Sequence, residues 1–410
     1  MDLLEQSVRV HFQFPVHFTT GLFDPANPVL RTVTSVPDDP RPADAVVVVD
    51  AGVHDAHPAL LSTIAAYFEA HADALRLAAP PLVVPGGEAA KNDPVHLQAL
   101  HGLIHDAALC RHSFVIAVGG GAILDVVGYA AATAHRGIRL IRVPTTVLSQ
   151  DDSAVGVKNG VNAFGKKNYF GTFAPPFAVL NDFAFLPTLE LRDWLGGVAE
   201  AVKASLIRDA AFFAEIETLA PRLVARDQAA MERVIRRSAA IHLSHIANGG
   251  DPFELGASRP LDFGHWAAHR LEHLTGHRLR HGEAVAIGVA LDTTYACLTG
   301  SLSPGDWRRV IDLFLALELP LAVPELSAHA DDPSHPRSVM RGLEEFREHL
   351  GGRLTVMLLR GIGSAFDVHE IRPEVMIKSI GMLVRIDAAR SSEAAADEVQ
   401  LPALARGSSS

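Results

Sequence analysis

The first half of the chain alternates short apolar runs with longer amphipathic stretches. The run at residues 45–50 (AVVVVD) is apolar up to its final acid, as in a strand buried on both faces of a parallel sheet. Similar runs predict strands within 81–87, 114–119 and 139–144, whereas residues 8–14 (VRVHFQF) alternate with a period of two and predict a half-buried strand. Strands separated by helix-length stretches indicate βαβ units and a parallel sheet.

The pattern changes after about Pro187, and residues 190–318 are typical of several long amphipathic helices. One late strand is predicted at 353–359 and a closing helix at 372–387. A chain of 410 residues exceeds the size at which a single core stops growing, so two domains are expected. We therefore predict an α/β fold with a Rossmann-like nucleotide-binding domain (1–187), a mainly α-helical domain (188–390) and a disordered tail (391–410).

Charge and composition narrow the class of protein. The formal net charge of −11 repels polyphosphate backbones, so nucleic acid is not an expected partner. The N-terminal segment lacks the basic and apolar regions of a signal peptide, and no apolar run approaches the ~20 residues of a membrane span. Cys110 and Cys297 lie in apolar helical patterns and are expected to be buried free thiols, not a disulfide or ligands. These features predict a cytoplasmic protein without a membrane partner.

A glycine turn follows the apolar run at 114–119. Gly119, Gly120 and Gly121 precede a helical pattern, with Asp125 one turn into it. Glycines there let the backbone approach a pyrophosphate, which the positive end of the helix then binds. The motif is not GxGxxG, so a simple turn is the alternative. Asp50 ends its strand where an acid can bind a ribose hydroxyl, or else cap the next helix.

The strongest local signal lies in the helical half. Glu200 stands in GGVAEAVK, with Lys203 one turn later. Further on, LDFGHWAAHRLEHLTGHRLRHGEAVAIG holds His265, His269, His273, His277 and His281. One carboxylate and two imidazoles leave an open position on a zinc-type ion, as a catalytic metal site requires. Spacing alone does not choose the ligands, although His265 and His269 at i, i+4 share a helix face. Ordinary surface or core histidines are the alternative.

A third cluster is polar and basic. The segment DDSAVGVKNGVNAFGKKN contains Asp152, Lys158, Lys166, Lys167 and Asn168. Its glycines, asparagines and alternating valines predict a hairpin that carries cations at its tips, suited to binding a phosphate. A solvated basic loop is the alternative.

Together these segments resemble the 3-dehydroquinate synthase superfamily, the sugar phosphate cyclases, over about residues 45–300. The resemblance rests on PGGEAAK, GGGAILDVVGYAAATAHRG, VPTTVLSQDDSAVGVKNGVN, GKKN, GGVAEAVK, and FGH with HGEAVAIG. It implies a carbon–oxygen lyase that uses NAD and one divalent ion, zinc or cobalt. The expected substrate is a phosphorylated sugar, and the expected assembly is a homodimer.

Matching positions extend the resemblance to single residues. It implies the metal ligands Glu200, His265 and His281 instead of the i, i+4 pair. It implies NAD contacts from Asp50, Glu88, Lys91, Gly120, Gly121, Asp125, Thr145, Thr146, Asp152, Lys167, Asn168 and Thr188. The phosphate-binding positions match Lys158, Asn168, His269 and Arg136, and the arginine would come from the partner subunit. Lys203 matches a lysine that contacts substrate hydroxyls, and Asp152 would lie near both nicotinamide and substrate.

The chain departs from 3-dehydroquinate synthases at the positions that serve the substrate carboxylate. His242 replaces a lysine, Ser258 replaces an arginine (or Arg259, with a slip of one residue), and Asp262 replaces an asparagine. A late lysine is also absent, with Glu348 and His349 nearby. A misplaced charge about 4 Å away costs roughly 4 kcal/mol at an effective dielectric constant of about 20, so a carboxylated sugar is disfavoured.

We therefore predict sedoheptulose 7-phosphate as substrate, with CH₂OH in place of the carboxylate. His242, Asp262, His269, Asp152 and Lys203 are the expected catalytic residues. LDFGHWAAHRLE resembles most closely the 2-epi-valiolone synthases, with 2-epi-5-epi-valiolone synthases and 3-dehydroquinate synthases as alternatives. Two other classes stay open: a metal-dependent polyol dehydrogenase of the glycerol dehydrogenase type, and a catalytically inactive relative kept as a binding protein.

Overall fold

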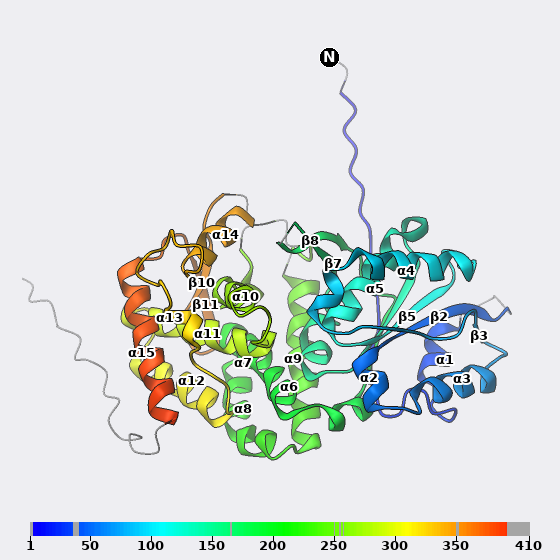
Figure 1. Cartoon of the computed structure of the whole chain (residues 1–410), viewed down its shortest axis with the longest axis horizontal. Helices are drawn as coiled ribbons and strands as arrows, with labels where there is room; N and C mark the ends of the chain where they lie inside the picture. The colour runs from blue at the N-terminus through cyan, green and yellow to red at the C-terminus, as the bar shows by residue number, and fades with distance from the viewer. Residues whose placement is uncertain are drawn as a thin grey trace, which may run out of the picture. The chain divides into compact units, whose positions relative to one another are not determined.

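The computed structural model describes residues 3–35, 41–164, 166–249, 251–253, 256, 258–349 and 352–391. The chain divides into two compact units (Figure 1). The α/β unit comprises Met1–Ala201 and Arg226–Phe253, and the helical unit comprises Val202–Ala225 and Glu254–Ser410.

This division differs from the boundary expected at residue 187. It falls within α7 (Val198–Arg208), and it assigns α9 (Gln228–Asn248) to the α/β unit. Helix α9 packs on the π-helical turn η3 (Ser149–Ser153), which is a long-range contact that composition does not reveal. Most of the tail expected at 391–410 lies outside the described residues.

A parallel sheet forms the centre of the α/β unit. Its strand order is β1-β9-β6-β5-β2-β3, with β4 also paired to β2. The strands are β1 (Val16–Thr19), β2 (Ala43–Asp50), β3 (Leu75–Leu77), β4 (Leu82–Val84), β5 (Phe114–Gly119), β6 (Arg139–Pro144) and β9 (Ala178–Asp182). The helices of this unit are α1 (Val29–Thr34), α2 (Ala51–Ala56), α3 (Leu60–Ala70), α4 (Pro94–Asp106), α5 (Gly121–Thr133), α6 (Leu191–Gly196) and α9. The short turns η1 (Glu88–Lys91), η2 (Ala134–Arg136) and η4 (Phe183–Thr188) connect them.

The sheet is covered on both faces, which explains the continuous apolar run in β2. Val46 and Val48 belong to one apolar cluster, whereas Ala45, Val47 and Val49 belong to a second one. Successive side chains of a strand point to opposite faces, so each cluster lies on its own face. The predicted parallel sheet and its strands within 45–50, 81–87, 114–119 and 139–144 are confirmed.

The strand predicted at residues 8–14 is wrong. The first strand begins at Val16 and pairs with β9, and residues 3–15 form no strand. Val8, Val10 and Phe12 are exposed. The period of two is present in the sequence, but within the described chain no sheet edge pairs with this segment, and only Phe14 at its end packs against the core.

The basic segment forms the predicted hairpin. Strands β7 (Lys158–Ala163) and β8 (Lys166–Phe173) pair antiparallel. Lys166 lies at the turn, as expected for a cationic tip. Lys158 pairs in register with Phe173 and therefore lies at the base of the hairpin.

The helical unit is built around α11 (His281–Leu298), which is buried along almost its whole length. Its other helices are α8 (Ala210–Val224), α10 (His265–Leu274), α12 (Pro304–Ala316), α13 (Pro324–Ser327), α14 (Arg341–His349) and α15 (Pro373–Ser391), with the short turn η5 (Pro260–Asp262) before α10. The late strand and the closing helix are confirmed as β10 (Val356–Gly361) and α15, and β10 pairs with a strand that was not predicted, β11 (Ser364–Val368).

The two cysteines differ in their surroundings. Cys297 is buried in α11, as expected. Cys110 is exposed, beyond the end of α4, so the prediction of a buried helical thiol is wrong there. The short segment between α4 and β5 lies at the surface, as connecting loops normally do. Within the described part of the chain, no helix has the length and hydropathy that a bilayer crossing requires.

Candidate active site

The three expected metal ligands come together. Ligand atoms of Glu200, His265 and His281 all lie within 4.8 Å of one another. Glu200 is in the first turn of α7, and the two histidines are the first residues of α10 and α11. Glu200 and His265 are buried, and the side chain of His281 is 25% exposed. The cluster combines one carboxylate with two imidazoles, a donor set that suits zinc or cobalt.

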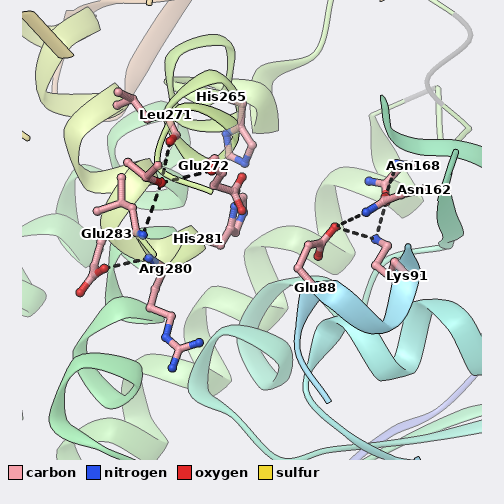
Figure 2. A network of polar contacts seen from close by, with 12 residues as sticks. Glu88, Lys91, Asn162, Asn168, His265, Leu271, Glu272, Arg280, His281 and Glu283 are labelled. Carbon is pink, nitrogen blue, oxygen red and sulfur yellow. Dashed lines mark hydrogen bonds and ion pairs between the residues drawn. The ribbon is translucent and has the colours of Figure 1, made fainter. Parts of the chain in front are cut away.

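Hydrogen bonds orient both rings, and Figure 2 shows Glu272 beside His281. Nδ1 of His265 lies 3.2 Å from the carbonyl oxygen of Phe263, and Nδ1 of His281 lies 3.1 Å from Oε2 of the buried Glu272. If each Nδ1–H donates to its oxygen, Nε2 keeps its lone pair for a cation. The cluster therefore fits a divalent ion, with the partners of each imidazole already in place.

The remaining histidines of the segment do not share this arrangement. His269 forms a second possible group with Glu272 and His281, but neither of the two groups contains both His265 and His269. His269 is exposed, as are His273 and His277. The rings of His265 and His269, the i, i+4 pair that spacing favours, lie beside each other with centroids 5.3 Å apart, but each histidine belongs to a different group with a glutamate. Lys203, one turn after Glu200 on α7, is buried.

The glycine turn connects β5 to α5. Gly120 is the N-cap of α5, and a Cβ atom at Gly121 would lie 2.8 Å from Oγ of Ser153. The hydroxyl oxygens of Ser153 and Thr145 are buried and have no hydrogen-bond partner among the described residues. A helix N-terminus beside two such hydroxyls fits a phosphate or amide group of a dinucleotide. Ser153 was missed from the sequence, although it lies in the quoted DDS block.

Asp50 has the capping role that the sequence left open. Its Oδ1 accepts a hydrogen bond from the backbone N–H of Gly52, 2.8 Å away, at the start of α2. Burial raises the pKa of this carboxyl group. Gly86 is packed against the same carboxylate, since a Cβ there would lie 2.3 Å from Oδ1. One carboxylate oxygen is thus committed to the fold.

Four of the expected NAD contacts form one network with Lys91 at its centre, and Figure 2 shows Lys91 with Glu88 and Asn168. The buried Nζ of Lys91 lies 2.7 Å from Asp125 and 3.8 Å from Glu88, and it donates to Oδ1 of Asn168. Asn162, which the sequence analysis did not select, donates to Glu88 over 3.1 Å and accepts from the backbone N–H of Asn168. The network ties the hairpin β7–β8 to η1 and α5.

The other expected contacts are placed individually. Oγ1 of Thr146 lies 2.7 Å from Oγ of Ser149, and Oγ1 of Thr188 lies 3.0 Å from Nε2 of His57. Arg136 is exposed with φ of +64° in a turn after α5. Lys158 is exposed, and Lys167 is half-buried, on the hairpin.

Asp152 and His242 are paired. Nδ1 of His242 on α9 lies 2.8 Å from Oδ1 of Asp152 in η3, and both side chains are mostly buried. The sequence selected both residues but did not predict this contact, because they are 90 positions apart.

Asp262 has a cationic neighbour. Nη1 of Arg259 lies 4.0 Å from Oδ2 of Asp262, and both side chains are mostly buried. The family resemblance placed Ser258 where 3-dehydroquinate synthases have an arginine, with Arg259 one residue away. Because this guanidinium offsets the carboxylate, Asp262 repels an anionic substrate less than its charge alone suggests.

Comparison with known proteins supports one family. The 3-dehydroquinate synthase N-terminal model matches residues 81–195, and the C-terminal model matches residues 197–334. A 3-dehydroquinate synthase from Geobacter sp. (strain M21) is 42% identical over 262 residues, covering 63% of this chain and 72% of that protein. One from Ruegeria sp. (strain TM1040) is 38% identical over 299 residues, covering 72% and 79%.

Two solved structures are similar to this chain over most of its length. ValA, a 2-epi-5-epi-valiolone synthase from Streptomyces hygroscopicus subsp. jinggangensis 5008 with NAD⁺ and Zn²⁺ bound, has a TM-score of 0.82 at 29% identity, covering 94% of this chain and 100% of that one. A 2-deoxy-scyllo-inosose synthase, at 24% identity and a TM-score of 0.72, covers 90% and 96% and shares the fold. The chain therefore belongs to the 3-dehydroquinate synthase family of sugar phosphate cyclases.

Proposed function

We propose that this cyclase converts sedoheptulose 7-phosphate into a C7 cyclitol, 2-epi-valiolone, with loss of phosphate. When bound, NAD would supply the transient oxidation of one ring carbinol to a ketone, with the hydride taken from and later returned to substrate carbon, and a divalent ion would polarise the substrate oxygens. The net reaction consumes no NAD. The NAD⁺ and Zn²⁺ named for ValA support these two cofactors here.

The pair formed by Asp152 and His242 carries the substrate assignment. If Nδ1–H of the neutral ring donates to Asp152, Nε2 presents a lone pair and accepts a hydrogen bond. A hydroxyl group can donate to that nitrogen, whereas a carboxylate only accepts hydrogen bonds. A lysine at this position would present an ammonium group instead and would favour a carboxylate. His242 therefore favours the hydroxymethyl group of sedoheptulose 7-phosphate.

The remaining substrate contacts are proposed from the family positions. The phosphate would be bound by Lys158, Asn168 and His269, with Arg136 contributed by the second subunit of a homodimer. Lys203 would hold ring hydroxyls, and Asp262 would accept hydrogen bonds from hydroxyls while Arg259 balances its charge. The NAD contacts would be Ser153, Thr145 and the residues around Lys91.

The assignment is tested with purified protein, NAD⁺ and Zn²⁺ or Co²⁺. We expect sedoheptulose 7-phosphate to release phosphate and to yield a cyclitol identified by NMR. Turnover of the carboxylated heptulosonate phosphate alone would identify a 3-dehydroquinate synthase, the activity for which the relatives at 36–42% identity are named. Net accumulation of NADH with a simple polyol would identify a polyol dehydrogenase instead.

Replacing His242 with lysine is expected to shift substrate preference. The variant H242K places an ammonium group where a carboxylate can bind, and hydrogen bonds to charged groups contribute about 1.5–3 kcal/mol. The ratio of kcat/KM for the carboxylated substrate over sedoheptulose 7-phosphate should rise about 10- to 100-fold. H245K, one turn later on α9, is the matched control. An unchanged ratio in H242K would contradict the role given to this histidine.

A further inference from the structure

A buried carboxylate is hydrogen-bonded to both chain neighbours of His265. Asp292 on α11 is fully buried. Its Oδ1 accepts a hydrogen bond from Nε1 of Trp266 over 2.9 Å, and its Oδ2 accepts one from the backbone N–H of Gly264 over 3.2 Å. These two donors flank His265, the first residue of α10. The family resemblance did not imply a role for Asp292.

Close backbone packing reinforces this contact. Gly264 has φ of +77°, and a Cβ on it would lie 2.5 Å from the backbone nitrogen of Val289. A Cβ on Gly288 would lie 2.1 Å from the carbonyl oxygen of Gly264. The start of α10 therefore rests directly on α11, one turn before Asp292, where side chains larger than hydrogen do not fit.

The same helix carries the second imidazole. His281 is the first residue of α11, and Asp292 follows eleven positions later. At 3.6 residues per turn, eleven positions return to nearly the same face of a helix. A carboxylate at the N-terminus of α10 is also favoured by the partial positive charge of that helix end. One face of α11 thus bears His281, the docking point for Gly264 and the acceptor for both neighbours of His265.

We infer that Asp292 is a positioning residue for His265, because it fixes the first turn of α10 so that this imidazole is aligned with His281 and Glu200. Asp292 belongs to neither metal-binding group of the described residues, so it would act through Gly264 and Trp266. The inference rests on the proposed metal site. It predicts that changing Asp292 alters the geometry and affinity of the bound ion, and not the stability of the fold alone.

The test measures metal binding by the full chain at pH 8. Burial raises the pKa of Asp292 to about 7, so the carboxylate is largely ionised there. In D292N the amide group must turn its NH₂ toward one of the two donors. We expect the Zn²⁺ affinity, measured by competition with a chelator, to fall about 10-fold, the lower end of the loss seen when a group bonded directly to a metal-binding histidine is changed. The visible absorption of the Co²⁺-loaded protein should shift.

Matched variants separate positioning from stability. D387N removes the charge of a carboxylate on α15 that accepts from the backbone N–H of Leu321, and it should leave Zn²⁺ affinity unchanged. W266F removes one of the two donors to Asp292 and should give a smaller loss of Zn²⁺ affinity. This variant tests the inference if D292N does not fold. G288A should displace the start of α10, whereas G381A, with only the end of a side chain 3.5 Å away, should not.

The outcomes are distinguishable. Unchanged Zn²⁺ affinity and Co²⁺ absorption in folded D292N, or in W266F if D292N does not fold, would overturn the inference while leaving the metal site intact. A wild-type chain that binds neither Zn²⁺ nor Co²⁺ would instead refute the proposed function.

Discussion

Replacing Glu200 with glutamine is expected to abolish most cyclase turnover. The substitution keeps the shape of the side chain but removes the one negative charge of the cluster with His265 and His281. The two neutral imidazoles alone bind a divalent cation less tightly, and the charge stabilisation supplied by the cation is lost with it. Loss of a comparable electrostatic contribution in other enzymes lowers kcat by about 10²- to 10³-fold.

Two measurements check this expectation. Metal content after dialysis should fall from about one ion per chain to well below one in E200Q, and kcat with the proposed substrate, sedoheptulose 7-phosphate, should fall in parallel. E374Q, an exposed glutamate in the first turn of α15, is the control and should keep both. An E200Q variant that retains its ion and turnover would remove Glu200 from the site.

Replacing Arg142 with methionine is expected to destabilise the α/β unit strongly. Arg142 is 1% exposed on β6. Its guanidinium donates to the carbonyl oxygens of Ala154, Gly156 and Lys158 over 2.8, 2.6 and 2.9 Å, and to Oδ1 of Asn159 over 2.7 Å. Burial lowers its pKa to about 10, so it still carries a charge at neutral pH.

Methionine would fill the volume and leave these oxygens without their donor. Each buried acceptor left unsatisfied costs about 1–3 kcal/mol, so the free energy of unfolding should fall by about 3 kcal/mol or more. The variant should also raise KM, because Arg142 holds the backbone at Lys158, the proposed phosphate ligand. Urea unfolding followed by circular dichroism, together with KM, measures both effects.

R139M, a control on the same strand, tests whether the effects of R142M are specific to the buried arginine. Arg139 lies three residues earlier on β6, is partly exposed and donates to the carbonyl oxygen of His112 over 3.2 Å. R139M should cost less than about 1 kcal/mol and leave KM unchanged. Equal losses in R139M and R142M would show that the buried cation has no special role.

Part of the candidate site could be predicted from sequence patterns and from the family resemblance. The hairpin, the glycine turn and the residues Glu88, Lys91, Asp125 and Asn168 were selected from the sequence, and the structure joins these four side chains in one network. Asn162 and Ser153 were missed because neither has a distinctive spacing. Only their contacts with Glu88 and with the turn at Gly121 single them out.

Other features depended on contacts between distant segments. Residues 8–14 have the periodicity of a strand, but a strand also needs a partner edge, and periodicity does not report one. Spacing favoured His265 and His269 as a pair of metal ligands. The group that includes His265 instead contains His281 and Glu200, which is 65 positions before His265. The pairing of His242 with Asp152, and of Arg259 with Asp262, changed the electrostatic character of both expected substrate contacts.

The amino-acid sequence by itself determined the parallel sheet, the βαβ order, the helical second half and the family. These follow from local periodicity and from motifs that are contiguous in the chain. The tertiary structure decided which side chains meet, where the two units divide, and that Asp292 holds the start of α10. Such contacts join residues that are far apart in sequence, and their geometry is set by how helices and strands pack, which no local pattern encodes.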